Sequence, residues 1–189
     1  MINIIMKYII SFIIIFYSLL TPLHAKVINN LIVKGNDRIS SQTIKVFSGF
    51  NAGDNINQNN LNDIIKELYN TNFFKEVSVE IENNNLIITV SENPIIQEVI
   101  IEGIKKEGFK KEIYSVLELK NKSSYVEFIA KNDLQKIKNS LRVSGFYLSE
   151  VKTSIKENDN NTIDLIYNIN LGQKALIKDI KFIGDKKFK

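Results

Sequence analysis

The chain of 189 residues has no cysteine, no tryptophan and one histidine, and its formal net charge is +4. Disulfide bonds, cysteine nucleophiles and Cys/His metal sites are therefore excluded or nearly so, and neither a metal nor another cofactor is expected. The pI of 9.0 reflects lysines spread along the sequence, without the dense basic run typical of nucleic-acid binding. The composition favours a protein that is not an enzyme and binds no nucleic acid.

Residues 1–25 have the layout of a secretory signal peptide. Lys7 precedes an apolar run at residues 8–20, and Ala25 ends a short segment of the kind that precedes a cleavage site. The run is shorter than the roughly 20 residues that a membrane-spanning helix needs. We therefore expect an exported protein whose mature chain starts after Ala25. The alternative is a retained N-terminal anchor, because residues 2–6 would lengthen the run if Lys7 reached the membrane surface.

The mature sequence opens with a predicted strand followed by a short helix. Residues 27–33 carry apolar side chains on one side with a period of two, and Gly35 follows them. Ser40 or Ser41 is a suitable N-cap for a helix that Gly49 ends.

A second helix and a hairpin complete this first unit. Asn57 or Asn59 is a suitable N-cap, and residues 61–68 place leucines and isoleucines on one helical face. Asn72 follows where a left-handed conformation ends the helix. Two strands are then predicted at residues 74–81 and 86–90, joined by an asparagine-rich turn.

The same order of elements recurs after Pro94. The predicted elements are a strand at residues 95–102 closed by Gly103, a helix at 109–117, a longer helix capped by Ser124, and strands at 147–155 and 163–169. The longer helix carries four apolar residues on one face: Ala130, Leu134, Ile137 and Leu141. Gly145 occupies the place of Asn72, so the segments LYNTNFFKEV and LRVSGFYLSEV correspond.

A third copy begins near the end of the sequence. ALIKDIKFIGDKKFK reproduces the opening strand, and Gly184 stands where Gly35 and Gly103 stand in the first two copies. The predicted fold class is α+β, with tandem β-α-α-β-β units in which a three-stranded sheet carries two helices on one face. The expected organisation is a signal peptide at 1–25, units at 26–93 and 94–172, and the start of a truncated unit at 173–189. The sequence is thus interpreted as a fragment of a longer protein.

This pattern resembles the POTRA arrays of outer-membrane barrel-assembly proteins. The resemblance rests on NLIVKGNDRIS at residues 30–40, on the two corresponding segments at 68–77 and 141–151, and on IKDIKFIGDKKF at 177–188. Asn72 departs from the glycine usual in the family's turn. The resemblance implies a periplasmic arm ahead of an outer-membrane barrel beyond Lys189. It also implies unfolded outer-membrane proteins and accessory assembly lipoproteins as partners.

The expected mechanism is strand addition at a sheet edge. A three-stranded sheet leaves an outer strand with unpaired backbone groups, which an extended precursor can pair with whatever its sequence. The first hairpin strand of each unit is the expected free edge, with these candidate partner-binding residues: Phe74, Val77, Val79, Ile81, Tyr147, Val151, Thr153 and Ile155. The alternative is that the charged residues along these strands serve only to prevent aggregation.

Other functions remain open at this stage. The chain would fit a relative of the same superfamily that secretes one dedicated partner. It would also fit an inner-membrane-anchored POTRA scaffold of the division type, although the repetition argues against that class. A KH-type RNA-binding module shares the β-α-α-β order, but residues 117–124 contain no glycine where its GXXG loop would lie.

Overall fold

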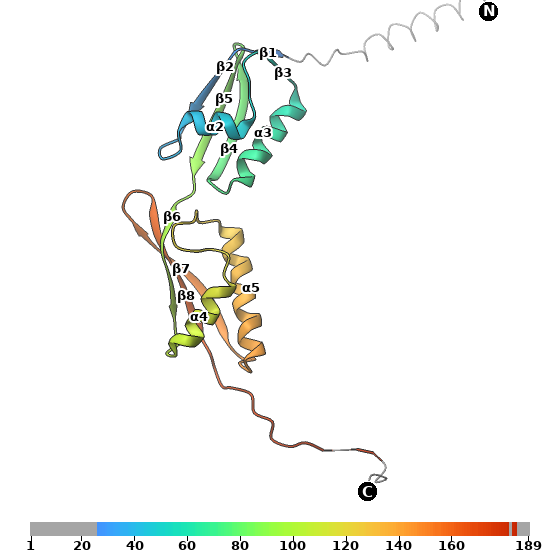
Figure 1. The fold of residues 1–189 in the computed structure, drawn as a ribbon, viewed down its shortest axis with the longest axis vertical. Helices are drawn as coiled ribbons and strands as arrows, with labels where there is room; N and C mark the ends of the chain where they lie inside the picture. The colour runs from blue at the N-terminus through green and yellow to red at the C-terminus, as the bar shows by residue number, and fades with distance from the viewer. Residues whose placement is uncertain (1–25, 182, 185–189) are drawn as a thin grey trace, which may run out of the picture. The chain divides into compact units, whose positions relative to one another are not determined.

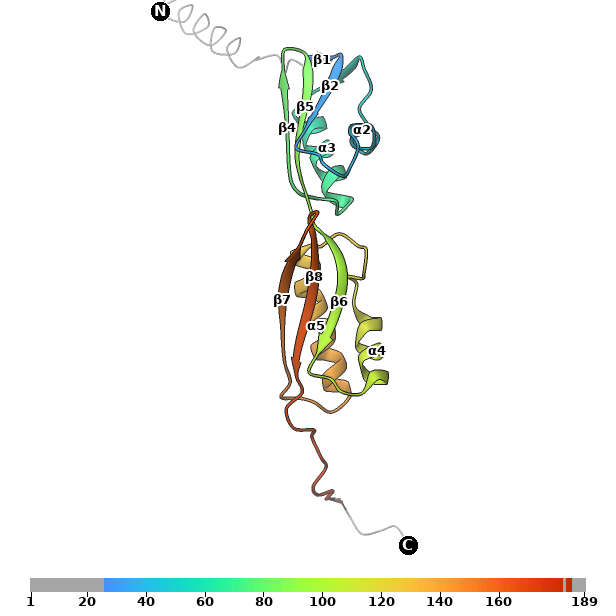
Figure 2. The same ribbon diagram turned by 90° about the vertical axis from the view of Figure 1, so that its left-hand side faces the viewer.

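The computed structural model describes residues 26–181, 183 and 184, so the signal peptide predicted at residues 1–25 lies outside the described residues. The chain forms two compact units that meet in sequence near residue 91. In each unit, two helices lie on one face of a three-stranded sheet (Figure 1 and Figure 2). The predicted α+β fold of tandem β-α-α-β-β units is therefore confirmed.

The first unit is built on a sheet with the order β2-β5-β4. Its elements are β1 (Lys26–Ile28), β2 (Asn30–Lys34), α2 (Ser41–Ser48), β3 (Asp54–Ile56), α3 (Gln58–Asn70), β4 (Phe74–Glu82) and β5 (Asn85–Glu92). β2 runs parallel to β5, with Asn30 opposite Asn85. Asn83 and Asn84 both have positive φ, as a tight hairpin turn between β4 and β5 requires.

The second unit repeats this topology with the order β6-β8-β7. Its elements are β6 (Ile95–Glu102), α4 (Glu107–Val116), α5 (Glu127–Val143), β7 (Glu150–Asn158) and β8 (Thr162–Asn170). β6 is parallel to β8, and β7 is antiparallel to β8 with Val151 opposite Ile169. In both units the last strand in the sequence, β5 or β8, lies at the centre of the sheet.

The helices form where their apolar residues face the sheet. Ile64 and Leu68 of α3 are buried, as are Ala130, Ile137 and Leu141 of α5. Each fully buried isoleucine or leucine contributes about 1.5–3 kcal/mol to stability. The predicted caps of the first unit also form: the Ser40 hydroxyl accepts from the Thr43 N–H, and the Asn57 side chain accepts from the N–H of Asn59 and Asn60.

Glycine is required at positions 35 and 103 for the same structural reason. Both have positive φ, and both lie directly against the backbone of the central strand. A side chain at Gly35 would meet the carbonyl oxygen of Val90, and one at Gly103 would meet that of Ile169. Only glycine allows this approach, which explains the repeat of the residue in the sequence.

The turn after the second helix anchors the chain that leaves each unit. In the first unit the Asn93 N–H donates to the Phe73 carbonyl at 2.8 Å, and its side-chain amide donates to the Asn72 carbonyl at 2.9 Å. In the second unit the Ala175 N–H donates to the Gly145 carbonyl at 2.8 Å. The repeated segments at 68–77 and 141–151 therefore share a backbone role.

The aromatic pairs in these segments are less alike. Phe74 is 3% exposed and packs edge-on against Phe73. Phe146 is partly buried and stacks on Phe109, whereas Tyr147 is 63% exposed. The aromatic contribution to the core thus comes from different positions of the pair in the two units.

The single strand predicted at residues 27–33 was wrong. The chain breaks at Asn29, and β1 pairs antiparallel with β3, a strand that the sequence did not indicate. Ile28 is fully buried, while Val27 is 50% exposed. Residues 26–28 therefore pair with the loop between α2 and α3. β2 alone pairs with the main sheet.

Two boundaries in the second unit were also wrong. Ser124 does not cap α5; it forms an isolated bridge with Ile95, and α5 starts at Glu127. The strand expected from Tyr147 begins only at Glu150. At the end of α5, the N–H groups of Gly145 and Phe146 donate to carbonyls of the last helical turn, and the chain turns again before β7 can pair.

The opening strand of the third copy is not formed among the residues that the structure describes at 171–181, 183 and 184. Ile177 and Ile180 are 81% and 69% exposed, although the corresponding Ile28, Ile96 and Val99 are buried. In both complete units the opening strand forms by parallel pairing with the closing strand of the same unit.

A buried carboxylate organises the loop between α4 and α5. Asp133 is 0% exposed, and its oxygens accept from the N–H groups of Glu118 at 2.8 and 3.0 Å and of Leu119 at 2.9 Å. The Tyr167 hydroxyl lies 3.4 Å from Asp133, and the Lys136 ammonium lies 3.2 Å from it. Burial, followed by the nearby charge of Asp133, raises the pKa of Tyr167.

Candidate functional site

β4 is an edge of the first sheet, because among the described strands it pairs with β5 alone. Along its second half the side chains alternate, with Val77, Val79 and Ile81 half-buried and the residues between them exposed. Phe74, at the start of the strand, is buried in the core. Its side chain is therefore directed inward, and only its backbone belongs to the edge.

Tyr69 covers one position of this edge. Its hydroxyl accepts from the Val77 N–H at 3.1 Å, although Tyr69 lies in the last turn of α3. Because N–H direction alternates along a strand, the N–H groups of Val79 and Ile81 point to the same side as that of Val77. Tyr69 was not among the residues predicted from the sequence to lie at this edge. The signal was its position, directly after the last apolar residue of the α3 face in LYNTNFFKEV.

β7 is the corresponding edge of the second sheet. Val151 is buried, Thr153 is half-buried, and Ile155 is 44% exposed. Tyr147 lies in the turn before the strand, so its expected place on the edge was wrong.

The outer face near β7 is polar. Lys156 lies 3.5 Å from the carboxylate of Asp164, and the Asn168 amide donates to the Ser154 hydroxyl at 2.9 Å. Charged side chains of this kind beside an edge strand hinder pairing between copies of the same sheet.

Residues 26–181, 183 and 184 contain no group of three or more histidine, aspartate or glutamate side chains placed to hold a metal ion. Within the same residues, no helix has the length and hydropathy needed to cross a bilayer.

The chain matches the POTRA family, described as "Surface antigen variable number repeat", over residues 26–93 and 94–172. These two matches cover most of the sequence, and the chain belongs to this family.

Relatives within the family are outer membrane protein assembly factors. The chain is 28% identical over 159 residues to the outer membrane protein assembly factor BamA of Nitratidesulfovibrio vulgaris, covering 82% of this chain and 20% of that protein. It is 27% identical over 162 residues to BamA of Neisseria meningitidis serogroup B, covering 84% of this chain and 20% of that protein. The resemblance to BamA-type POTRA arrays is thus confirmed. The chain spans about a fifth of the length of these relatives.

The fold also matches a solved structure. The N-terminal domain of Omp85 from Thermosynechococcus elongatus superposes with a TM-score of 0.51 at 16% identity, covering 75% of this chain and 61% of that one. At this level of identity the similarity concerns the fold alone.

Proposed function

We propose that this chain belongs to the periplasmic arm of an outer-membrane β-barrel assembly protein. The observation that carries the proposal is the pair of POTRA units, each with a free hairpin edge, in a sequence similar to BamA. The arm has no catalytic role. It receives unfolded barrel precursors at β4 and β7 and docks accessory assembly lipoproteins, while a barrel elsewhere in the whole protein holds it at the outer membrane.

Strand addition explains how one surface accepts many precursors. An incoming extended segment forms backbone hydrogen bonds with the edge, and those bonds do not depend on its side chains. Four or five such bonds contribute about 0.5–1.5 kcal/mol each, and ordering the segment offsets part of that gain. The resulting affinity is weak, so the precursor can leave for the next step of assembly.

The half-buried residues of the edges provide a limited preference for strands with alternating apolar residues. Val79 and Ile81 on β4, and Thr153 on β7, are the half-buried positions of these edges, and Thr153 lies opposite the buried Tyr167. An incoming strand with alternating apolar residues would place side chains beside these positions, because side chains on neighbouring strands align in register. Barrel strands have this alternation, with one apolar and one polar face.

The test is site-specific photocrosslinking in cells that make the whole protein. A photoreactive residue replaces Val79 or Thr153 on the edges, or Asn62 or Asn132 on exposed helix surfaces as matched controls. We expect crosslinks to unfolded outer-membrane proteins from the edges and none from the helices. Equal crosslinking at all four positions, or crosslinks to no barrel precursor, would contradict the proposal.

Fractionation tests the location independently. We expect the two units to become accessible to protease only after the outer membrane is permeabilised, and a mature N-terminus at Lys26 by intact mass. A retained Met1 in the inner membrane would instead indicate an anchored scaffold.

A further inference from the structure

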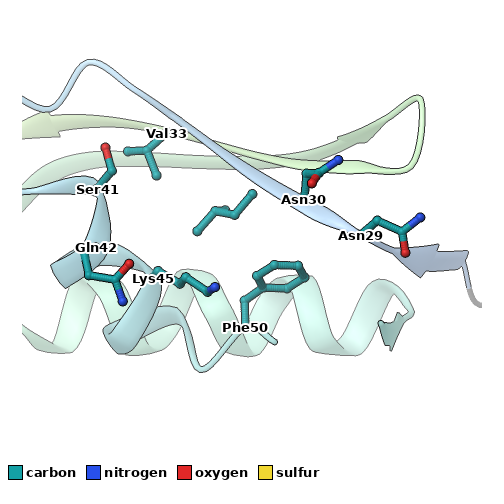
Figure 3. Close-up of a pocket in the computed structure, with 8 residues that line it drawn as sticks. Asn29, Asn30, Val33, Ser41, Gln42, Lys45 and Phe50 are labelled. Carbon is teal, nitrogen blue, oxygen red and sulfur yellow. The ribbon is translucent and has the colours of Figure 1, made fainter. Parts of the chain in front are cut away.

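The other edge of the first sheet carries an open groove. β2 has β5 as its only neighbour in the main sheet, and α2 lies beside it on the helix-covered face (Figure 3). The groove between them has a volume of about 240 Å3. It is lined by strand and helix residues together: Asn29, Asn30, Leu31, Val33, Ser41, Gln42, Lys45 and Phe50.

The lining combines an apolar floor with polar groups at its rim. Leu31 and Val33 are half-buried and Phe50 is buried, whereas Asn29 and Gln42 are exposed. Amide side chains at a rim can bond to the backbone of an extended peptide as both donors and acceptors. A pocket for alternate side chains beside an edge strand is the arrangement by which strand addition gains selectivity.

Lys45 gives the groove a positive charge. Its ammonium lies 6.0 Å from the centre of the Phe50 ring, and Figure 3 shows the two side chains directed toward one another. Among the described residues, no carboxylate lies within ion-pair distance of Lys45. An acidic side chain in the groove would therefore find an unpaired cation over an apolar floor.

The second unit shows what fills the corresponding place. When the units are aligned on Gly35 and Gly103, Leu31 corresponds to Val99. The Val99 N–H donates to the side-chain oxygen of Asn121 at 2.9 Å, so a carbonyl oxygen from the α4–α5 loop occupies that edge. In the first unit the Gly53 N–H donates to the Ile28 carbonyl, as the Lys122 N–H donates to the Ile96 carbonyl in the second, so Ala52 stands where the second unit has Asn121. Alanine brings no side-chain oxygen to the β2 edge.

We propose that the groove between β2 and α2 binds an extended peptide that adds to the β2 edge and places an acidic side chain against Lys45. Carbonyl oxygens of the peptide take the role that Asn121 has in the second unit. An apolar side chain of the peptide packs on Leu31, Val33 and Phe50. This edge is opposite to β4, so its occupancy is independent of strand addition at β4.

The probe is a labelled, end-blocked peptide of about eight residues, the length of a strand. It alternates valine and threonine with one central aspartate, and a matched peptide has lysine in place of the aspartate. Chemical shifts of the isotope-labelled chain locate the site. We expect the aspartate peptide to perturb residues 30–34 and α2, and to bind more tightly than the lysine peptide.

Charge reversal tests the role of Lys45. We expect Lys45→Glu to weaken binding of the aspartate peptide about fivefold and to strengthen binding of the lysine peptide, because a partly exposed pair contributes about 1 kcal/mol or less. Lys45→Gln should weaken binding of the aspartate peptide without strengthening binding of the lysine peptide. Lys66→Glu on α3 is the matched control and should change neither affinity.

Three results would overturn the groove as a peptide site. These are perturbations confined to residues 74–82, perturbations in neither region, and equal affinities of the two peptides for the unaltered chain and for Lys45→Glu. The first of these would leave strand addition at β4 intact. The groove and the proposed function can therefore fail separately.

Discussion

The two units build the loop between their helices in different ways. In the first unit the loop contains β3, whose backbone pairs with β1. In the second unit the loop backbone also pairs with the start of β6, where the Ile96 N–H donates to the Ser123 carbonyl at 2.9 Å and the Lys122 N–H donates to the Ile96 carbonyl at 2.7 Å. It is held in addition by the carboxylate of Asp133, which is fully buried. Backbone pairing of the loop is therefore common to the two units, and the second unit adds a buried side-chain charge.

Corresponding positions show how local this difference is. Asn60 stands eight residues before Leu68, as Asp133 stands eight residues before Leu141, but Asn60 is exposed and accepts only from the Asn57 N–H. Ile88 is buried where the second unit has Tyr167. The apolar helix face and the glycine contact are therefore common to the two units, whereas the side-chain contacts of the loop differ.

The largest expected effect on stability is that of Asp133→Ala. Removing the carboxylate leaves the N–H groups of Glu118 and Leu119 without their acceptor, so we expect the second unit to lose about 3–5 kcal/mol of unfolding free energy. Residue-resolved hydrogen exchange measures each unit separately. Asn60→Ala is the matched control and should cost less than about 1 kcal/mol. Equal losses from both substitutions would show that Asp133 has no special role.

Gly103→Ala tests a feature that the two units share. The new methyl group would meet the Ile169 carbonyl at a positive φ, and we expect a loss of about 1–3 kcal/mol, with a similar loss for Gly35→Ala. Urea unfolding measures both. Gly108→Ala in α4 is the control: no atom lies near its Cβ position, and alanine should stabilise the helix by about 0.5–1 kcal/mol. A tolerated Gly103→Ala would contradict the close approach.

Alkaline pH should lower the stability of the second unit, because Tyr167 is buried there. Its folded pKa is raised above the ordinary value by burial and then by Asp133. The stabilisation is therefore complete below about pH 10 and is lost as pH rises above it, by about 1.4 kcal/mol per pH unit while the folded tyrosine stays protonated. Unfolding measured from pH 9 to pH 12 should show this slope in the chain and a smaller one in Tyr167→Phe. Identical slopes would refute the assignment.

The smallest expected effect concerns the β4 edge. Tyr69→Phe removes the acceptor for the Val77 N–H, and we expect a loss of about 0.5–1 kcal/mol. Amide exchange at Val77 should become faster, while amides in the second unit, where Arg142 occupies the corresponding position, remain unchanged. Unaltered exchange at Val77 would mean that the hydroxyl does not protect this edge in solution.

Local patterns in the sequence determined much of the architecture. The period of the apolar residues predicted α3 and α5, and Ser40, Asn57 and Asn72 have the capping and turn roles expected from their side chains. These features depend on neighbours within about four residues, so a single sequence contains the information. The order of elements was sufficient to identify the POTRA pattern and to predict β4 and β7 as hairpin strands.

Tertiary structure decided the features that join distant residues. Pairing of β1 with β3 divides the first strand, and the turn after α5 places the start of β7 at Glu150. The burial of Asp133 had a weak local signal, because it lies four residues before Ile137 on the apolar side of α5. Its acceptance of two loop N–H groups depends on how α5 packs on the sheet. Sequence periodicity indicates which face of a helix is buried, but only the packed chain determines which backbone groups that face must satisfy.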